Sequence, residues 1–172
     1  MDTYAKLGFY FNESNRDSSF FYLDQSIPLA EKLKLKLYEA DLLGNWGYLL
    51  AYTDYPKAFE LLSRALQIAE DPESEKNTWY LSVGQTPHQS RLNELGLTQL
   101  VLGQLYGNTG DTAKKISSLL QSKVIAEELK DSALNMLANL NLGNAYYSKK
   151  MLDSAFIIKE QAVSFFLEIA QS

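Results

Sequence analysis

Large apolar residues recur three and four positions apart along most of this chain, which is the spacing of amphipathic helices. Within this pattern one short motif repeats. Four glycines, Gly8, Gly47, Gly103 and Gly143, each follow a large apolar residue and precede another one three positions later. The spacings between successive glycines are 39, 56 and 40 residues. The first and last spacings agree, and the middle one contains an insertion.

A second set of positions follows each glycine by eleven or twelve residues and recurs seven residues later. All of these residues are small except Lys115; they are Ser19, Ser26, Ala58, Ala65, Ser122, Ala155 and Ala162. A glycine on one helix and small residues on the next let two antiparallel helices approach closely. The pattern therefore predicts four helical hairpins, with helices over 2–12 and 17–33, 36–52 and 55–70, 90–107 and 112–129, and 132–148 and 151–170. Asp17, Asp54 and Asp111 are the expected N-caps.

The length of 172 residues predicts one domain over 1–172. We divide it into repeat 1 (1–35), repeat 2 (36–70), an insertion (71–91), repeat 3 (92–130) and repeat 4 (131–172). The first helix is short and the last helix has two apolar faces, so we expect this sequence to be a fragment of a longer protein.

The motif resembles the tetratricopeptide repeat (TPR), most plainly in Leu102-Gly103 with Tyr106 and in Leu142-Gly143 with Tyr146. Lys115 departs from the family pattern, and the period is nearer 40 residues than the usual 34. The longer period is similar to that of variants found in bacterial signalling regulators and sensor kinases. The resemblance implies an all-α, right-handed α-solenoid of four hairpins, whose concave groove binds protein or peptide partners.

Composition limits the chemistry. The chain has no cysteine and one histidine, His88, which excludes disulfides, thiolate catalysis and sites that need two imidazoles. A net charge of −5 and a pI near 4.9 make nucleic acid an unexpected partner. No stretch is long and apolar enough to predict a membrane span. We therefore expect no enzyme activity, no cofactor and no metal site.

The TPR resemblance also indicates which side chains line the groove, counted from each glycine. These candidates are Phe9, Asn12, Asp41, Tyr48, Tyr52, Gln104, Asn108, Asn144 and Tyr147. Tyrosine and amide side chains suit the backbone donors and acceptors of an extended peptide. The alternative is that they are ordinary solvated residues. In chaperone-binding members a lysine clamps a C-terminal carboxylate, but Ala5, Gly44, Leu100 and Leu140 stand at the matching positions here.

The insertion contains an apolar segment with Trp79 and Tyr80, between Pro72 and Pro87. These side chains either pack against the flank of the repeats or form a partner-binding element beside the groove. His88 at its edge is expected to be a helix-start or surface residue.

The last predicted helix has one apolar face for its hairpin partner and a second face that includes Phe156, Val163 and Leu167. The second face predicts a possible homodimer. The function predicted from the sequence is a non-catalytic scaffold that binds a protein or peptide in the groove. The alternative is the ligand-sensing input domain of a bacterial signal-transduction protein, a sensor kinase or a transcriptional regulator. The compartment stays open between the cytoplasm and the extracytoplasmic part of a membrane-anchored sensor.

Overall fold

A computed structural model describes residues 2–11, 14–78 and 86–171 of the chain. The described part is all-α and contains no strand, which confirms the predicted class. Its elements are the helices α1 (Asp2–Phe11), α2 (Arg16–Lys32), α3 (Lys36–Leu50), α4 (Tyr55–Glu70), α5 (Pro87–Asn108), α6 (Thr112–Leu129), α7 (Ser132–Ser148) and α8 (Leu152–Gln171), and the short 3-10 helix η1 (Pro72–Lys76).

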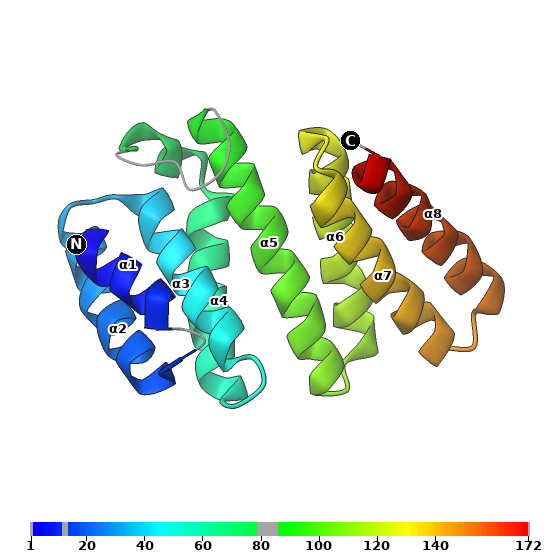
Figure 1. The fold of residues 1–172 in the computed structure, drawn as a ribbon, viewed down its shortest axis with the longest axis horizontal. Coiled ribbons are helices and arrows are strands. Elements are labelled where there is room, and N and C mark those ends of the chain that lie inside the picture. The colour runs from blue at the N-terminus through cyan, green and yellow to red at the C-terminus, as the bar shows by residue number, and fades with distance from the viewer. Residues whose placement is uncertain (1, 12–13, 79–85, 172) are drawn as a thin grey trace. The chain divides into compact units, whose positions relative to one another are not determined.

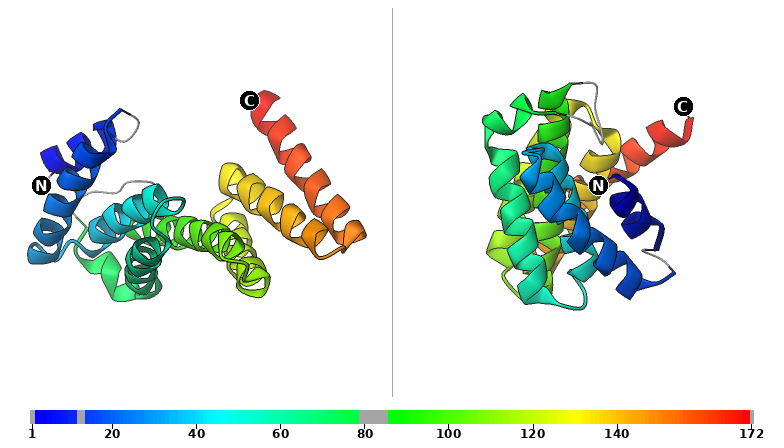
Figure 2. Two further views of the ribbon diagram at one scale, coloured as in Figure 1. Left: turned by 90° about the horizontal axis from the view of Figure 1, so that it is seen from below. Right: turned by 90° about the vertical axis from the view of Figure 1, so that its left-hand side faces the viewer.

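The helices form two compact units, residues 1–94 and 95–172, and the division falls within α5. In the first unit α1 packs on α2, α2 on α3 and α3 on α4, while η1 lies against both α3 and α4 (Figure 1). In the second unit α7 packs on both α6 and α8. The α7/α8 hairpin is plain in the left view of Figure 2. In each of these pairs, helices that follow one another in sequence are neighbours in space.

Each repeated glycine lies where the following helix approaches its own helix closely. A Cβ added to Gly47 would lie 2.6 Å from Cγ of Leu62, and one added to Gly103 would lie 2.8 Å from Cγ of Leu119. Gly8 meets Leu23 in the same way, at 2.9 Å. No side chain fits in this space without displacing its neighbour. The glycines are therefore sites of close helix approach, as the sequence predicted.

The small residues of the second set are buried on the facing helices: Ser19, Ser26, Ala58, Ala65, Ser122, Ala155 and Ala162. The Ser19 hydroxyl also donates a 2.7 Å hydrogen bond to the Gly8 carbonyl, which joins α1 to α2. The exception, Lys115, is accommodated by a second glycine. Its Cδ would lie 2.9 Å from a Cβ at Gly107.

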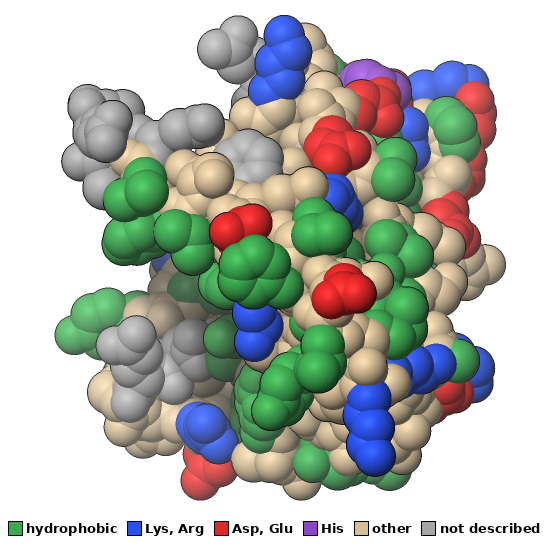
Figure 3. Space-filling view, turned by 90° about the vertical axis from the view of Figure 1, so that its right-hand side faces the viewer, with side chains coloured by type: hydrophobic (Ala, Val, Ile, Leu, Met, Phe, Trp, Pro, Cys, Tyr) green, Lys and Arg blue, Asp and Glu red, His purple; other side chains and the backbone are tan. Residues whose placement is uncertain are grey.

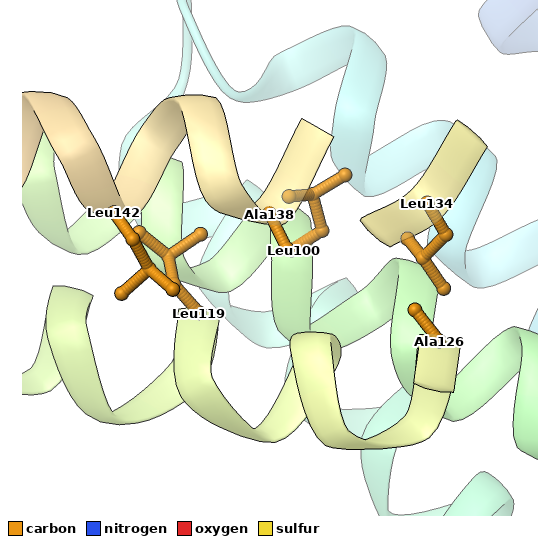
Figure 4. Packing of buried hydrophobic residues seen from close by; sticks show 6 residues of the cluster. All are labelled: Leu100, Leu119, Ala126, Leu134, Ala138 and Leu142. Atoms are coloured by element: carbon orange, nitrogen blue, oxygen red, sulfur yellow. The ribbon is translucent and has the colours of Figure 1, made fainter. Parts of the chain in front are cut away.

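The core of the second unit is a cluster of leucines and alanines from three helices (Figure 4). Leu100 of α5 packs with residues of α6 and α7, namely Leu119, Ala126, Leu134, Ala138 and Leu142. In the first unit the fully buried leucines are Leu23, Leu42, Leu43, Leu61 and Leu62. No described helix is long and apolar enough to cross a membrane.

Helix starts follow side-chain capping, with one difference from the prediction. Asp54 and Asp111 accept hydrogen bonds from the backbone N–H groups of Lys57 and Lys114, as predicted. The prediction for α2 was wrong. Asn15 caps that helix by accepting from Ser18, and Asp17 lies in the first turn. There Asp17 still favours the helix, because the first turn carries the positive end of the helix dipole.

Candidate functional site

One face of α3 carries Asp41, Asn45 and Tyr48, and Tyr52 continues the same spacing just beyond the helix. They are separated by four, three and four residues, which returns each one to the same side of a helix. Tyr52 lies in the turn just after the helix ends. The tyrosines are open to solvent, with 49% of Tyr48 and 62% of Tyr52 exposed. We call these four residues the α3 stripe.

Asp41 is the first residue of the α3 stripe and is only partly exposed. The Asn45 amide donates to its Oδ1 at 2.8 Å and to its backbone carbonyl at 2.7 Å. Burial raises the pKa of Asp41 from 3.8 to about 6, because it disfavours the charged carboxylate, and the Asn45 hydrogen bond offsets this only in part. Within the described part of the chain, no lysine or arginine forms an ion pair with Asp41.

The second unit carries a corresponding face on α7. Asn144 and Tyr147, both predicted groove residues, are exposed there beside two exposed leucines, Leu137 and Leu140. The ammonium group of Lys159 on α8 lies 5.8 Å from the centre of the Tyr147 ring, a cation–π distance. This face therefore combines an aromatic ring with an amide. Among the described contacts, the charged group near Tyr147 is a cation, Lys159.

The other predicted groove residues occupy separate places. Phe9 is exposed on α1, Gln104 is partly buried on α5, and Asn108 is exposed at the end of α5. Asn12, Trp79 and Tyr80 lie outside the described residues. The sequence analysis missed Asn45, although its position four residues after Asp41 and three before Tyr48 marks it as part of the same face.

A cavity of about 470 Å³ lies where η1 folds back over α3 and α4. Its lining is mostly charged or polar: Lys36, Glu39, Arg64, Gln67, Ile68, Asp71, Glu73 and Ser74. Glu39, with 3% of its surface exposed, is the most enclosed of the charged residues. Its carboxylate lies 2.7 Å from Lys36 Nζ and 3.4 Å from Arg64, which also pairs with Glu31. Pairing with two cations offsets the cost of burying this charge.

The described flanks of the insertion are held firmly to the first unit. Arg91 of α5 donates to Glu75 at 2.6 Å and to the carbonyl of Ala69 at 2.9 Å. His88 lies in the first turn of α5, where it is exposed and 3.0 Å from the same Glu75 carboxylate. The Arg91 hydrogen bond, followed by that of His88, lowers the pKa of Glu75. These contacts give the beginning and end of the insertion a structural role.

No cluster of three His, Asp or Glu side chains that could hold a metal ion occurs among the residues described. Comparison of the chain with known protein families gives no matching family model, and a search of curated proteins gives no match either. The α3 stripe and the α7 face therefore stand on their own geometry.

Proposed function

We propose that this chain is a non-catalytic scaffold that binds an extended protein or peptide segment at the exposed face of α3. In this proposal the hairpins form a right-handed solenoid of the TPR type. The observation that carries the proposal is the α3 stripe. Two exposed tyrosines stand in line with an amide and a carboxylate, and neither tyrosine is part of the core.

The chemistry of both faces supports a peptide ligand. Each combines aromatic rings, which gain buried area at low conformational cost, with amides that can donate to and accept from a peptide backbone. Apart from Tyr52, the side chains of both faces lie on regular helices, so little order has to be gained on binding.

The test is a selection of linear peptides from a random displayed library, followed by titration of the selected peptides against variants. Tyr48→Ala should weaken binding about tenfold or more, as truncation of a binding aromatic does. The matched control is Phe21→Ala, which removes an exposed aromatic ring from α2 in the same unit. Equal binding by both variants and the parent would place the site away from α3, and Tyr147→Ala then tests the α7 face.

A second candidate function, self-association through α8, is favoured by one specific observation. Leu152, Phe156, Val163 and Leu167 leave 52–63% of their surface open to solvent. Figure 3, which faces the side where α8 lies in Figure 1, shows hydrophobic side chains open to solvent on this side. Meanwhile Ala155 and Ala162 are buried on the other side of the helix. An exposed face of this kind is typical of an interface.

Light scattering over a concentration series tests this second candidate. The parent should associate, and the double variant Phe156→Ser with Leu167→Ser should be a monomer. Ile157→Ser is the control, since Ile157 is equally exposed but lies about a third of a turn away around α8. If the parent stays monomeric at every concentration, the proposed self-association is wrong.

A further inference from the structure

Two acidic side chains of α3 differ in how their charge is compensated. Glu39 is buried against Lys36 and contacts Arg64 on α4. Asp41, two residues later, is partly buried with the Asn45 amide as its described side-chain partner. An amide stabilises a carboxylate far less than a cation does. The described part of the chain therefore compensates the desolvation cost of Asp41 only in part, through the Asn45 hydrogen bond.

The fold does not need this acid. Leu137 occupies the same place on α7, six residues before the repeated glycine, as Asp41 does on α3. Asn141 of α7 donates to the Leu137 carbonyl at 2.9 Å, as Asn45 does to the Asp41 carbonyl. The asparagine and its hydrogen bond to the backbone are thus also present on α7, where leucine stands in place of the acid. Among the residues that the structure describes, none gives a structural explanation for the Asp41 carboxylate, and a ligand supplies one.

Tyr48 adds an exposed aromatic ring to the same face of α3. It lies two helical turns after Asp41, about 10 Å along the axis, and side chains on a helix tend to lean toward its N-terminus. Gly44 stands between them on this face and adds no side chain. A carboxylate and an exposed ring on one helix face suit a planar, delocalised cation, which can pair with the acid and stack on the ring.

We infer that the α3 stripe receives an arginine of the bound peptide, whose guanidinium pairs with Asp41 while its side chain passes over Tyr48. This inference rests on the proposed function, because it names the chemistry that the same face selects. Arginine fits better than lysine, since its fork can donate two parallel hydrogen bonds to one carboxylate and its flat face can lie on a ring. The net charge of −5 also favours the approach of a basic segment.

The experiment compares peptide pools that are identical except at one position, which holds arginine, lysine, citrulline or glutamate between randomised flanks. Citrulline keeps the size and shape of arginine without its charge. The arginine pool should bind about tenfold more tightly than the citrulline pool, and the glutamate pool should bind worst. The preference for arginine should weaken at high salt.

Asp41→Asn should abolish the difference in affinity between the arginine and citrulline pools. Asp24→Asn is the matched control, because it removes one exposed carboxylate from α2 of the same unit and should keep the preference. Asp41→Asn removes an uncompensated charge, so the variant should fold at least as well as the parent.

The outcomes separate the inference from the proposed function. Peptides that bind through Tyr48 with no preference for arginine would overturn the inference and leave the scaffold function standing. An arginine preference that survives Asp41→Asn would also overturn it, since the cation would then bind elsewhere. If no pool binds the parent, and Tyr48→Ala does not weaken binding of the peptides selected from the displayed library, the proposed function itself fails.

Discussion

The helices α3 and α7 hold the same position in their hairpins and differ in what they carry. Both have the close-packed glycine, Gly47 or Gly143, and both have an asparagine that donates to the carbonyl four residues before it. The exposed face of α3 combines tyrosines with a carboxylate, whereas that of α7 combines amides, leucines and Tyr147. The repeat thus fixes the packing side of the helix and leaves the solvent side free to differ, which is where binding specificity can arise.

The packing side also differs at one point. Gly47 faces Leu62, which is fully buried, but Gly143 faces the aliphatic stem of Lys159, whose ammonium group reaches the Tyr147 ring. A leucine in a closed core has nowhere to move, while a lysine stem near the surface can swing outward. The two hairpins should therefore respond differently to the same substitution.

The largest expected effect follows from that difference. Gly47→Ala should destabilise the protein by about 2 kcal/mol, because the new Cβ would lie 2.6 Å from Leu62 Cγ. Gly143→Ala should cost about 1 kcal/mol or less, since Lys159 can move and alanine is the better helix former. Urea unfolding of the two variants and the parent measures both free energies of unfolding.

A double variant sharpens this comparison. Lys159→Leu gives the α7/α8 hairpin the residue type that Leu62 supplies to α3/α4. In that background Gly143→Ala should become as costly as Gly47→Ala. Similar costs for Gly143→Ala with and without Lys159→Leu would show that side-chain mobility is not the reason for the difference.

The scaffold could be predicted from the sequence because its signals are local and periodic. The start of α3, both ends of α4, α6 and α7, and the caps Asp54 and Asp111 follow from apolar spacing and turn residues. The start of α5 at Pro87 was missed by three residues, since the first turn there lacks apolar periodicity. Asn15 was missed because Asp17, two residues later, is an equally good capping residue in isolation.

The candidate site was predicted only in part, for a tertiary reason. Asp41 and Tyr48 share a face of α3 and Tyr52 follows just after the helix, so counting from Gly47 finds them. The contact between Glu39 and Arg64 joins residues 25 positions apart on two helices, and no local spacing signals it. The degree to which Asp41 is buried, which gives it its unusual pKa, likewise depends on packing around α3.

The α3 stripe also predicts a pH dependence that the α7 face, with Leu137 in the same place, does not. The pKa of Asp41 is about 6 in the folded protein and near 3.8 without burial, so the folded state binds more protons between these values. Stability due to this group is therefore greatest below about pH 4 and falls as the pH rises through 6. Asp41→Asn should raise the free energy of unfolding by about 2 kcal/mol at pH 8 and leave it almost unchanged near pH 4.

Urea titrations of the parent and Asp41→Asn across this range measure the effect. Asp24→Asn, on the exposed side of α2, should follow the parent at every pH. A parallel shift of Asp41→Asn at all pH values would mean that the substitution acts through packing rather than through the charge.

The smallest expected effect concerns the turns of the two hairpins. The turn between α7 and α8 contains Lys150 in the left-handed region, at φ 60°, whereas that between α3 and α4, over 51–54, contains no residue with positive φ. Gly110, at φ 87°, holds the corresponding place in the turn between α5 and α6. In the turns that contain Lys150 and Gly110, the backbone N–H of the following residue donates to a tyrosine carbonyl. Lys150→Gly should therefore stabilise the protein by about 0.5–1 kcal/mol, as glycine adopts this conformation without strain. Gly110→Ala should destabilise it by a similar amount, and thermal unfolding that shifts in the same direction for both variants would contradict this account.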